Sequence, residues 1–383
     1  MLSRKIMSRF ISFLFVLFLS DASVGEEILT PAPPDLPATA YILIDYDSGK
    51  VLADHNADEK LAPASLTKIM TVYVAFQELK NGNLALDDQV TVSKKAWQTP
   101  GSRMFIEVNT SVDVGNLLKG IIISSGNDAS VALAEHIAGD ESTFAELMNQ
   151  HAVRLGMTNT HFTNSMGLPD ENHHTSARDL ATLTRALIHE FPEYYTWHSM
   201  KEFTYNKITQ ANRNKLLWRD SAVDGVKTGY TEDAGYCLVA SAKKEEMRLI
   251  SVVMGTKSPN ARANQNQALL NYGFRFFETH QLYKPSESLA QVRVWKGDKK
   301  NLQLGLLDGL YVTIPRRHFD DLHATVQVDE KIMAPINLGD KHGALSILLQ
   351  DAPYTTVPLV ALESIPEGGI FRRVYDEALL LLK

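Results

Sequence analysis

Residues 63–76 read PASLTKIMTVYVAF, and the interpretation of the whole chain starts from this stretch. Pro63 suits the first turn of a helix, and Asn81 followed by Gly82 is typical of a helix end. The apolar side chains between them recur at near-helical spacing, at Leu66, Ile69, Met70, Tyr73, Val74 and Phe76. The pattern therefore predicts a largely apolar helix that carries Ser65 and Lys68 one turn apart.

The hydroxyl of Ser65 and the amine of Lys68 are neighbours on such a helix. Residues three positions apart lie about 5–6 Å from each other at Cβ, so the lysine can accept the serine proton. Only a neutral lysine can do this, and the pKa of Lys68 must then fall about three units below its reference value of about 10.4. Burial beside the apolar helix lowers a lysine pKa. The pair predicts a nucleophile, Ser65, and its base, Lys68.

Two further short motifs follow this pair along the chain. Ser125-Gly126-Asn127 lies between two predicted helices, and Lys227-Thr228-Gly229 lies on a predicted strand. Each motif alone is weak evidence, because the chain also contains Ser241-x-x-Lys244 in a polar turn and Ser258-Pro259-Asn260 at a predicted helix start. The three motifs in this order form a much more specific signature than any one of them.

The residue types of the two later motifs fit the same chemistry. Ser125 can relay a proton toward a leaving amine, and Asn127 can hold a substrate amide by hydrogen bonds. Lys227 adds a positive charge, which we expect to keep the base neutral by repulsion and to attract a substrate carboxylate. Thr228 can donate a hydrogen bond to that carboxylate, and Gly229 leaves backbone space beside it. An extended peptide is expected to pair along this strand.

Together the three motifs resemble those of the penicillin-binding proteins and class A β-lactamases. Five stretches also resemble the low-molecular-mass D-alanyl-D-alanine carboxypeptidases of the penicillin-binding protein 5 type: 125–129, 167–180, 212–218, 223–236 and 273–279. The resemblance implies removal of the terminal D-alanine from peptidoglycan stem pentapeptides through an acyl-enzyme on Ser65. It also implies acylation of Ser65 by β-lactam antibiotics and contact between Arg262 and the terminal carboxylate.

The chain departs from the family pattern at two positions. Gly126 stands where the middle motif can have Asp, and Tyr230 follows the Lys-Thr-Gly motif where some relatives have His. Both residues are compatible with the carboxypeptidase branch. For Arg262, the alternative to a carboxylate ligand is an exposed arginine at a helix start.

Length and composition place these motifs in an exported protein of two domains. The 383 residues exceed one typical domain of about 100–200 residues. Residues 1–25 have the layout of a secretory signal peptide, with three basic residues before a short apolar run. We expect a serine D,D-peptidase domain over 26–283, a small β domain over 284–365 and an amphipathic tail over 366–383.

The expected fold class is α+β, with a transpeptidase domain of the penicillin-binding and β-lactamase-like kind followed by a small all-β domain. Strand patterns at 40–54 and 202–255 predict a sheet built from both ends of the first domain. Helical patterning over 112–191 predicts a helical insertion, and one more helix is expected over 261–279. Short alternating runs after residue 283 predict the β domain.

The last residues, 370–383, place apolar side chains on one helical face and charged side chains on the other. Fourteen residues make a helix of about 21 Å, too short for a hydrocarbon core of about 30 Å. We expect this helix to attach the protein to the membrane surface, and the alternative is docking on its own protein. The expected location is the periplasm, at the outer face of the inner membrane.

Several other functions find little support in the sequence. A net charge of −7, with basic residues spread along the chain, gives no reason to expect a nucleic-acid partner. His173 and His174 lack the motifs that accompany metal sites, so no metal or other cofactor is expected. Two alternatives stay open: a β-lactamase, with Glu171 directing the deacylating water, and a non-catalytic protein that binds peptidoglycan.

Overall fold

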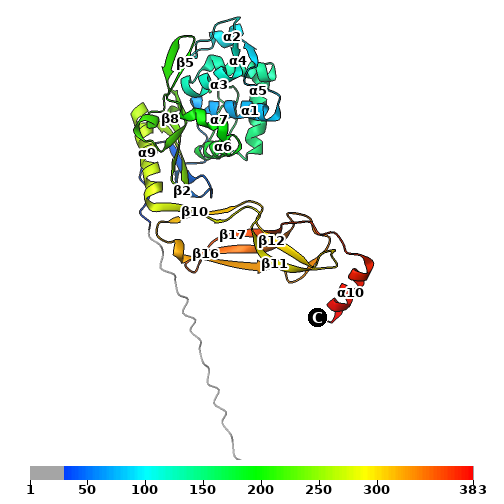
Figure 1. The fold of residues 1–383 in the computed structure, drawn as a ribbon. Helices are drawn as coiled ribbons and strands as arrows, with labels where there is room; N and C mark the ends of the chain where they lie inside the picture. The colour runs from blue at the N-terminus through cyan, green and yellow to red at the C-terminus, as the bar shows by residue number, and fades with distance from the viewer. Residues whose placement is uncertain (1–29, 383) are drawn as a thin grey trace, which may run out of the picture.

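An antiparallel sheet of five strands forms the centre of the N-terminal domain in the computed structural model, which describes residues 30–382 (Figure 1). The strand order is β2 (Val51–His55), β1 (Ala40–Asp45), β9 (Met247–Thr256), β8 (Gly235–Lys244) and β7 (Val223–Thr231). The N-terminal hairpin therefore pairs with strands from far along the chain, which confirms the predicted sheet. The predicted signal peptide lies outside the described residues.

Helices cover both faces of this sheet. Ile42 of β1 belongs to the core on one face, whereas Tyr41 and Leu43 belong to the core on the other. Side chains alternate between the two faces of a strand, so a strand that is apolar at every position needs a partner layer on each side. The layers are supplied by α6 (Ala177–Glu190), which contacts β1 and β9, and by α9 (Pro259–Phe276), which packs across β8 and β9.

The predicted helical insertion is helical over most of its length but also contains loops. Its long helices α4 (Asn127–Ala138), α5 (Glu141–Arg154) and α6 surround the buried α1 (Lys68–Asn81). Residues 155–176 form loops with isolated β-bridges, so the helical patterning expected there is wrong. Side chains replace helical hydrogen bonds in this segment: Asn149, for example, bonds both the N–H and the carbonyl of Phe162.

Two serines act as caps at helix starts, and the sequence placed one of them, Ser258, at such a start. Ser176 Oγ accepts the N–H of Asp179 at the start of α6, and Ser258 Oγ accepts the N–H of Ala261 at the start of α9. The remaining elements of this domain are short: η1 (Ala64–Thr67), β3 (Gln89–Thr91), α2 (Lys94–Gln98), β4 (Ser111–Asp113), α3 (Val114–Lys119), η2 (Gly120–Ser124), α7 (Pro192–Tyr195), η3 (Thr196–Ser199), β5 (Glu202–Tyr205), β6 (Ile208–Ala211) and α8 (Leu216–Arg219).

The second domain consists almost entirely of strands, as expected (Figure 1). The helix expected over 261–279 is wrong after Phe276, because the backbone turns extended at Phe277 and residues 277–279 pair with another strand. Strand pairing thus begins before residue 284, where we expected this domain to start. Its strands form the pair β10 (Phe277–Tyr283) and β13 (Leu310–Pro315) and a sheet in the order β14 (Leu322–Val328), β16 (Lys341–Leu349), β17 (Ala352–Ala361), β12 (Asn301–Gly305), β11 (Ser288–Trp295) and β15 (Ile332–Met333), with η4 (Phe319–Asp321) before β14.

Polar side chains join the two domains at the end of β1. The fully buried Asp45 accepts a hydrogen bond from Thr279 Oγ1 at 2.6 Å, and the hydroxyl of Thr279 lies 2.8 Å from that of Thr313. Ser48 Oγ lies 2.6 Å from Thr313 Oγ1, and Lys50 Nζ donates to the Thr313 carbonyl. A buried carboxylate is costly without such partners, so this network holds the β domain against the sheet.

The C-terminal helix α10 (Ile370–Leu381) lies at the end of the β domain away from the N-terminal domain (Figure 1). Its polar side faces the β domain: Asp376 is only 2% exposed and accepts hydrogen bonds from Arg293 Nη2 and the Lys296 N–H. Its apolar side chains remain in contact with solvent, and Phe371 is 95% exposed. Within residues 30–382, no helix is both long and apolar enough to cross a bilayer.

Candidate active site

Ser65 lies on a short 3-10 turn, η1, rather than within the single helix that the sequence predicted. The turn begins with Ala64, whose φ of +48° is left-handed, and the α-helix begins only at Lys68. An α-helix starting at Pro63 is therefore wrong, because Ala64 breaks the helical dihedral angles. The turn nevertheless keeps the predicted pair together, with Lys68 Nζ 3.0 Å from Ser65 Oγ.

Three oxygen atoms surround the amine of Lys68, which is 1% exposed. In addition to Ser65 Oγ, Asn127 Oδ1 and the carbonyl oxygen of Met166 each lie 2.7 Å from Nζ. An amide oxygen and a backbone carbonyl can only accept hydrogen bonds. A neutral amine has two N–H groups and one lone pair, so these two acceptors take both N–H groups. The lone pair is then left for the proton of Ser65.

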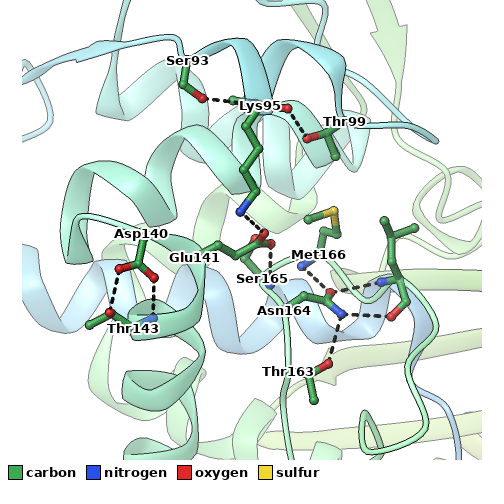
Figure 2. Close-up of polar contacts among 12 residues, drawn as sticks. Ser93, Lys95, Thr99, Asp140, Glu141, Thr143, Thr163, Asn164, Ser165 and Met166 are labelled. Atoms are coloured by element: carbon green, nitrogen blue, oxygen red, sulfur yellow. Dashed lines mark hydrogen bonds and ion pairs between the residues drawn. The ribbon is translucent and has the colours of Figure 1, made fainter.

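The two acceptors are themselves held in place. Asn127 Nδ2 donates to the Pro100 carbonyl at 2.6 Å, which fixes the amide with its oxygen toward Lys68. Asn164 Oδ1 accepts the backbone N–H groups of Met166, Gly167 and Leu168, at 3.3, 2.7 and 3.1 Å. Figure 2 shows Asn164 among these backbone groups. Its side chain therefore holds the Met166 carbonyl in the direction of the amine.

The loop at Met166 is tied to the rest of the domain from two sides. Ser165 donates both its N–H and its hydroxyl to Glu141, which also pairs with Lys95 at 3.0 Å (Figure 2). Gly167 has φ +88°, and a Cβ there would lie 1.8 Å from the carbonyl oxygen of Ala64. Only glycine allows this close approach, so the loop packs directly against the turn that carries Ser65.

The surroundings of Lys68 lower its pKa to about 7. Burial is the main cause, the positive charge of Arg213 adds to it, and Asp128 opposes it. We expected Lys227 to supply the neighbouring positive charge. Repulsion between the two lysines is present, but it acts on Lys227, whose own pKa lies well below the ordinary lysine value through burial and then repulsion from Lys68. Arg213, which the sequence did not single out, supplies the charge.

The second and third motifs meet beside this pair. Ser125 follows the π-helical turn η2 and has φ +60°, and its Oγ accepts a hydrogen bond from Lys227 Nζ at 2.9 Å. Lys227 also donates to the Thr228 carbonyl. Asp128, fully buried, accepts the N–H groups of residues 104–106 and so fixes the loop that lies over α4. The loop of residues 104–106 and the strand β7 thus form opposite walls around Ser65 and Ser125.

Arg262 lies at the end of the cleft formed by β7 and β8. Its Nη1 donates to the carbonyl of Gly229 at 2.9 Å and more weakly to that of Cys237 at 3.4 Å. The residue is buried, so the alternative of an exposed arginine at a helix start is wrong. Gly229 also touches the opposite wall, since a Cβ there would lie 3.0 Å from the Pro63 carbonyl oxygen. The third motif therefore closes directly over the turn of Ser65.

A cleft of about 500 Å³ runs between these walls. Six of the eight predicted site residues line this cleft. The other two, Lys68 and Lys227, are hydrogen-bonded to Ser65 and Ser125, respectively. The lining residues are Ser65, Gly101, Ser102, Ser125, Asn127, Met166, Gly167, Leu168, Arg213, Thr228, Gly229, Tyr230, Thr231, Tyr236, Pro259 and Arg262. The three sequence motifs converge on one place.

Other residues of the site were not found from the sequence. The Met166 carbonyl belongs to the backbone, and no residue type signals its use. His173, which we did not expect to bind a metal and gave no other role, is buried. Its Nε2 lies 2.8 Å from the hydroxyl oxygen of Thr67, the residue directly before Lys68. Its Nδ1 accepts the N–H of Thr163, which ties the 163–174 loop to the same turn.

Comparison with known proteins agrees with this geometry. Residues 27–258 match the family described as D-alanyl-D-alanine carboxypeptidase, and residues 277–367 match the family described as penicillin-binding protein 5, C-terminal domain. The chain belongs to the D-alanyl-D-alanine carboxypeptidase family. A carboxypeptidase of Escherichia coli (strain K12), DacC, is 48% identical over 373 residues, which cover 95% of this chain and 92% of that protein.

Solved structures of penicillin-binding proteins are also similar to this carboxypeptidase. Penicillin-binding protein 5 from Haemophilus influenzae has a TM-score of 0.85 and 41% sequence identity, covering 88% of this chain and all of the crystallised chain. Penicillin-binding protein D2 from Listeria monocytogenes, in its ampicillin-bound form, has a TM-score of 0.59 and 28% identity, covering 64% of this chain and 100% of its own. The second match is limited to part of the chain.

One alternative from the sequence, a β-lactamase, loses its support in the structure of this carboxypeptidase. Glu171, the candidate for directing a deacylating water in a β-lactamase, is exposed and is absent from the cleft wall. Among residues 30–382, no group of three or more His, Cys, Asp or Glu side chains is placed to hold a metal ion.

The pKa of Lys68 predicts the pH dependence of acylation. Because its pKa is lowered to about 7, the neutral base is present above this pH and is lost as pH falls through it. We expect acylation by penicillin, measured by stopped-flow, to reach half its maximum near pH 7 and to fall about tenfold per pH unit below pH 6. In Arg213→Gln the midpoint should move to higher pH, whereas Lys215→Gln, which alters an exposed cation outside the cleft wall, should not move it. A midpoint near pH 10 in the parent would contradict the prediction.

The hydrogen bonds of Asn164 predict a kinetic defect without loss of folding. In Asn164→Ala the Met166 carbonyl loses its support, and we expect the maximum acylation rate to fall at least about tenfold, equivalent to about 1.4 kcal/mol. The matched control is Asn149→Ala, which removes a similar amide from Phe162 in the same loop without touching Met166. Equal acylation rates in the two variants, at matched thermal stability, would show that Asn164 does not position the base.

Proposed function

We propose that this carboxypeptidase removes the terminal D-alanine from peptidoglycan stem pentapeptides through an acyl-enzyme on Ser65. The observation that supports this most directly is the amine of Lys68, which has a pKa of about 7 and, in its neutral form, two N–H groups bound to fixed acceptors. Its lone pair takes the Ser65 proton as Oγ attacks the carbonyl carbon of the penultimate D-alanine. The oxygen–carbon bond forms as the base becomes protonated.

The leaving D-alanine needs a proton on its nitrogen. Ser125 Oγ lies on the cleft wall and is bonded to Lys227 Nζ at 2.9 Å, so it can pass a proton to the departing amine as the amide bond breaks. The proton that Lys68 took from Ser65 then replaces the one that Ser125 gave up, which returns Lys68 to its neutral form. Water attacks the acyl carbon and gives a proton to Lys68, and Ser65 Oγ takes that proton back as the ester bond breaks and the shortened peptide leaves. Asn127, whose oxygen is engaged by Lys68, supports the base as well as the substrate amide that we first assigned to it.

The terminal carboxylate of the substrate fits the end of the cleft at Thr228 and Arg262. Arg262 uses Nη1 for backbone carbonyls, and a guanidinium has five N–H donors, so others remain for a carboxylate. Thr228 and Gly229 line the same end, and the guanidinium of Arg213, also on the cleft wall, adds positive charge to the cleft. A β-lactam carries a carboxylate beside a strained amide, so the same groups would direct it to acylate Ser65.

Export and membrane attachment complete the proposal. The signal-peptide layout of residues 1–25 supports delivery to the periplasm, with the peptidase domain over 26–283 and the β domain over 284–365. Attachment to the outer face of the inner membrane through 366–383 is supported by the orientation of α10. Its polar side pairs with the β domain through Asp376. Its apolar side chains stay exposed, at Ile370, Phe371, Val374, Tyr375, Leu381 and Leu382.

Mass spectrometry after incubation with penicillin tests the nucleophile. We expect one covalent adduct on the native protein and none on Ser65→Ala, together with loss of D-alanine release from a D-Ala-D-Ala pentapeptide. Ser241→Ala is the matched control, since Ser241 belongs to the other Ser-x-x-Lys sequence and lies in β8 against Arg248, and it should still form the adduct. An adduct on Ser65→Ala would reject the assignment.

Binding to vesicles that contain anionic phospholipids tests the tail. We expect the double variant Phe371→Ser and Tyr375→Ser to lose most of its vesicle binding, because both side chains lie on the exposed apolar side of α10. The control Arg373→Ser changes an exposed side chain that pairs with Glu367 and should keep the apolar side intact. If the double variant and the parent bound the vesicles equally, attachment through this helix would be wrong.

A further inference from the structure

Two stacked tyrosines stand at one end of the cleft, and nothing in the proposed mechanism uses them. Tyr230 follows the third motif on β7, and its residue partner across the antiparallel ladder is Tyr236 on β8. Their ring centroids are 4.2 Å apart, with 26° between the ring planes. Both residues line the cleft, although Tyr230 is 49% exposed. A large exposed ring that is held by stacking forms part of a binding surface more readily than part of a core.

The tyrosine pair is fixed in position by the structure beneath it. The turn that joins β7 to β8 is tight: Thr231 Oγ1 accepts the N–H of Ala234, and Gly235 has φ +63°. Cross-strand aromatic pairs stabilise the strands that carry them. The guanidinium of Arg262 lies 5.6 Å from the ring of Tyr236 and is itself bonded to the Gly229 carbonyl. Tyr230, Tyr236 and Arg262 therefore form one connected wall.

This wall lies on the leaving-group side of the cleft. In the proposed function the terminal carboxylate lies at Thr228 and Arg262, so the residue that departs occupies the space between Ser65 and this end. Thr228 and Tyr230 are two positions apart on β7 and face the same side of the strand. A substrate whose leaving residue carries a further peptide must place that peptide past the ring of Tyr230. A single D-alanine, with only a methyl side chain, need not.

We propose that the Tyr230–Tyr236 pair restricts the leaving group to one small residue and so makes the site select free stem-peptide ends over cross-linked peptides. In a cross-link, the acyl D-alanine is bound to the side-chain amine of a diamino acid, and the leaving group is a second peptide. Hydrolysis of that amide would use the same atoms of Ser65, Lys68 and water. The two substrates differ only in the size of the leaving group that must pass the Tyr230–Tyr236 pair. This inference rests on the proposed carboxypeptidase function.

The size of Tyr230 makes it the determining residue of the pair. Tyr236 supports it from the neighbouring strand and also contacts Arg262, so changes at Tyr236 would disturb the carboxylate end directly. Tyr230 has no such contact with the predicted catalytic groups, and its exposure allows a smaller side chain without leaving a buried cavity. Removing its ring opens the wall and leaves the nucleophile and base in place.

The experiment compares two substrates on the full mature chain. One is a soluble pentapeptide that ends in D-Ala-D-Ala, and the other is a dimer of stem peptides joined by a D-alanyl–diamino acid cross-link. Values of kcat/KM are measured for each by separating the products. In Tyr230→Ser we expect the ratio of cross-link cleavage to D-alanine release to rise at least about tenfold relative to the parent, equivalent to about 1.4 kcal/mol.

Two controls separate selectivity from general damage. Tyr230→Phe keeps the ring and should keep the parent ratio. Trp218→Ser removes an aromatic side chain that is also 49% exposed but does not line the cleft, and it should leave both rates unchanged. An unchanged ratio in Tyr230→Ser, or an equal fall in both rates, would overturn the inference. Failure of the parent to release D-alanine would instead reject the proposed function itself.

Discussion

The structure depends on one hydrogen-bonding constraint, the placement of a buried amine among three oxygen atoms. Lys68 reaches Ser65 with its lone pair only because Asn127 and the Met166 carbonyl take its two N–H groups. Burial gives the amine its lowered pKa, and it also makes every unsatisfied donor expensive. The two effects reinforce each other. A neutral lysine in this position has few alternative hydrogen bonds, so its lone pair stays directed at the nucleophile.

Each acceptor comes from a different part of the chain, and the architecture of the N-terminal domain brings them together. Asn127 starts α4, Met166 lies in the loop after α5, and Lys68 starts α1 at the centre of the helical layer. The strand β7 closes the other side with Lys227 and Thr228 and sits at the edge of the sheet, where a peptide can pair with its free side. The active site therefore forms where the helical layer meets an edge strand.

Different interactions hold the β domain and the C-terminal helix α10 in place. The buried Asp45 and its hydroxyl partners join the β domain to the first strand of the sheet. At the other end of the β domain, Asp376 holds α10 by its polar side and leaves the apolar side chains in solvent. Exposing so many apolar side chains is unfavourable in water, and it is the reason to seek a membrane surface for this helix. The β domain would then hold the active-site cleft away from the membrane surface.

The sequence by itself determined that Ser65 and Lys68 lie side by side and in which order the motifs follow, because a Ser-x-x-Lys pair is a local feature whose geometry follows from one turn of backbone. It also determined the sheet and most helices, since their apolar periods are local too. It did not reveal the extended backbone after Phe276 or the loops over 155–176, where partners distant in sequence outweigh helical patterning. The Met166 carbonyl, the positive charge of Arg213 and the position of His173 were decided only by the tertiary structure. A backbone oxygen carries no residue signature, and both burial and the distance between charges exist only once the chain has folded.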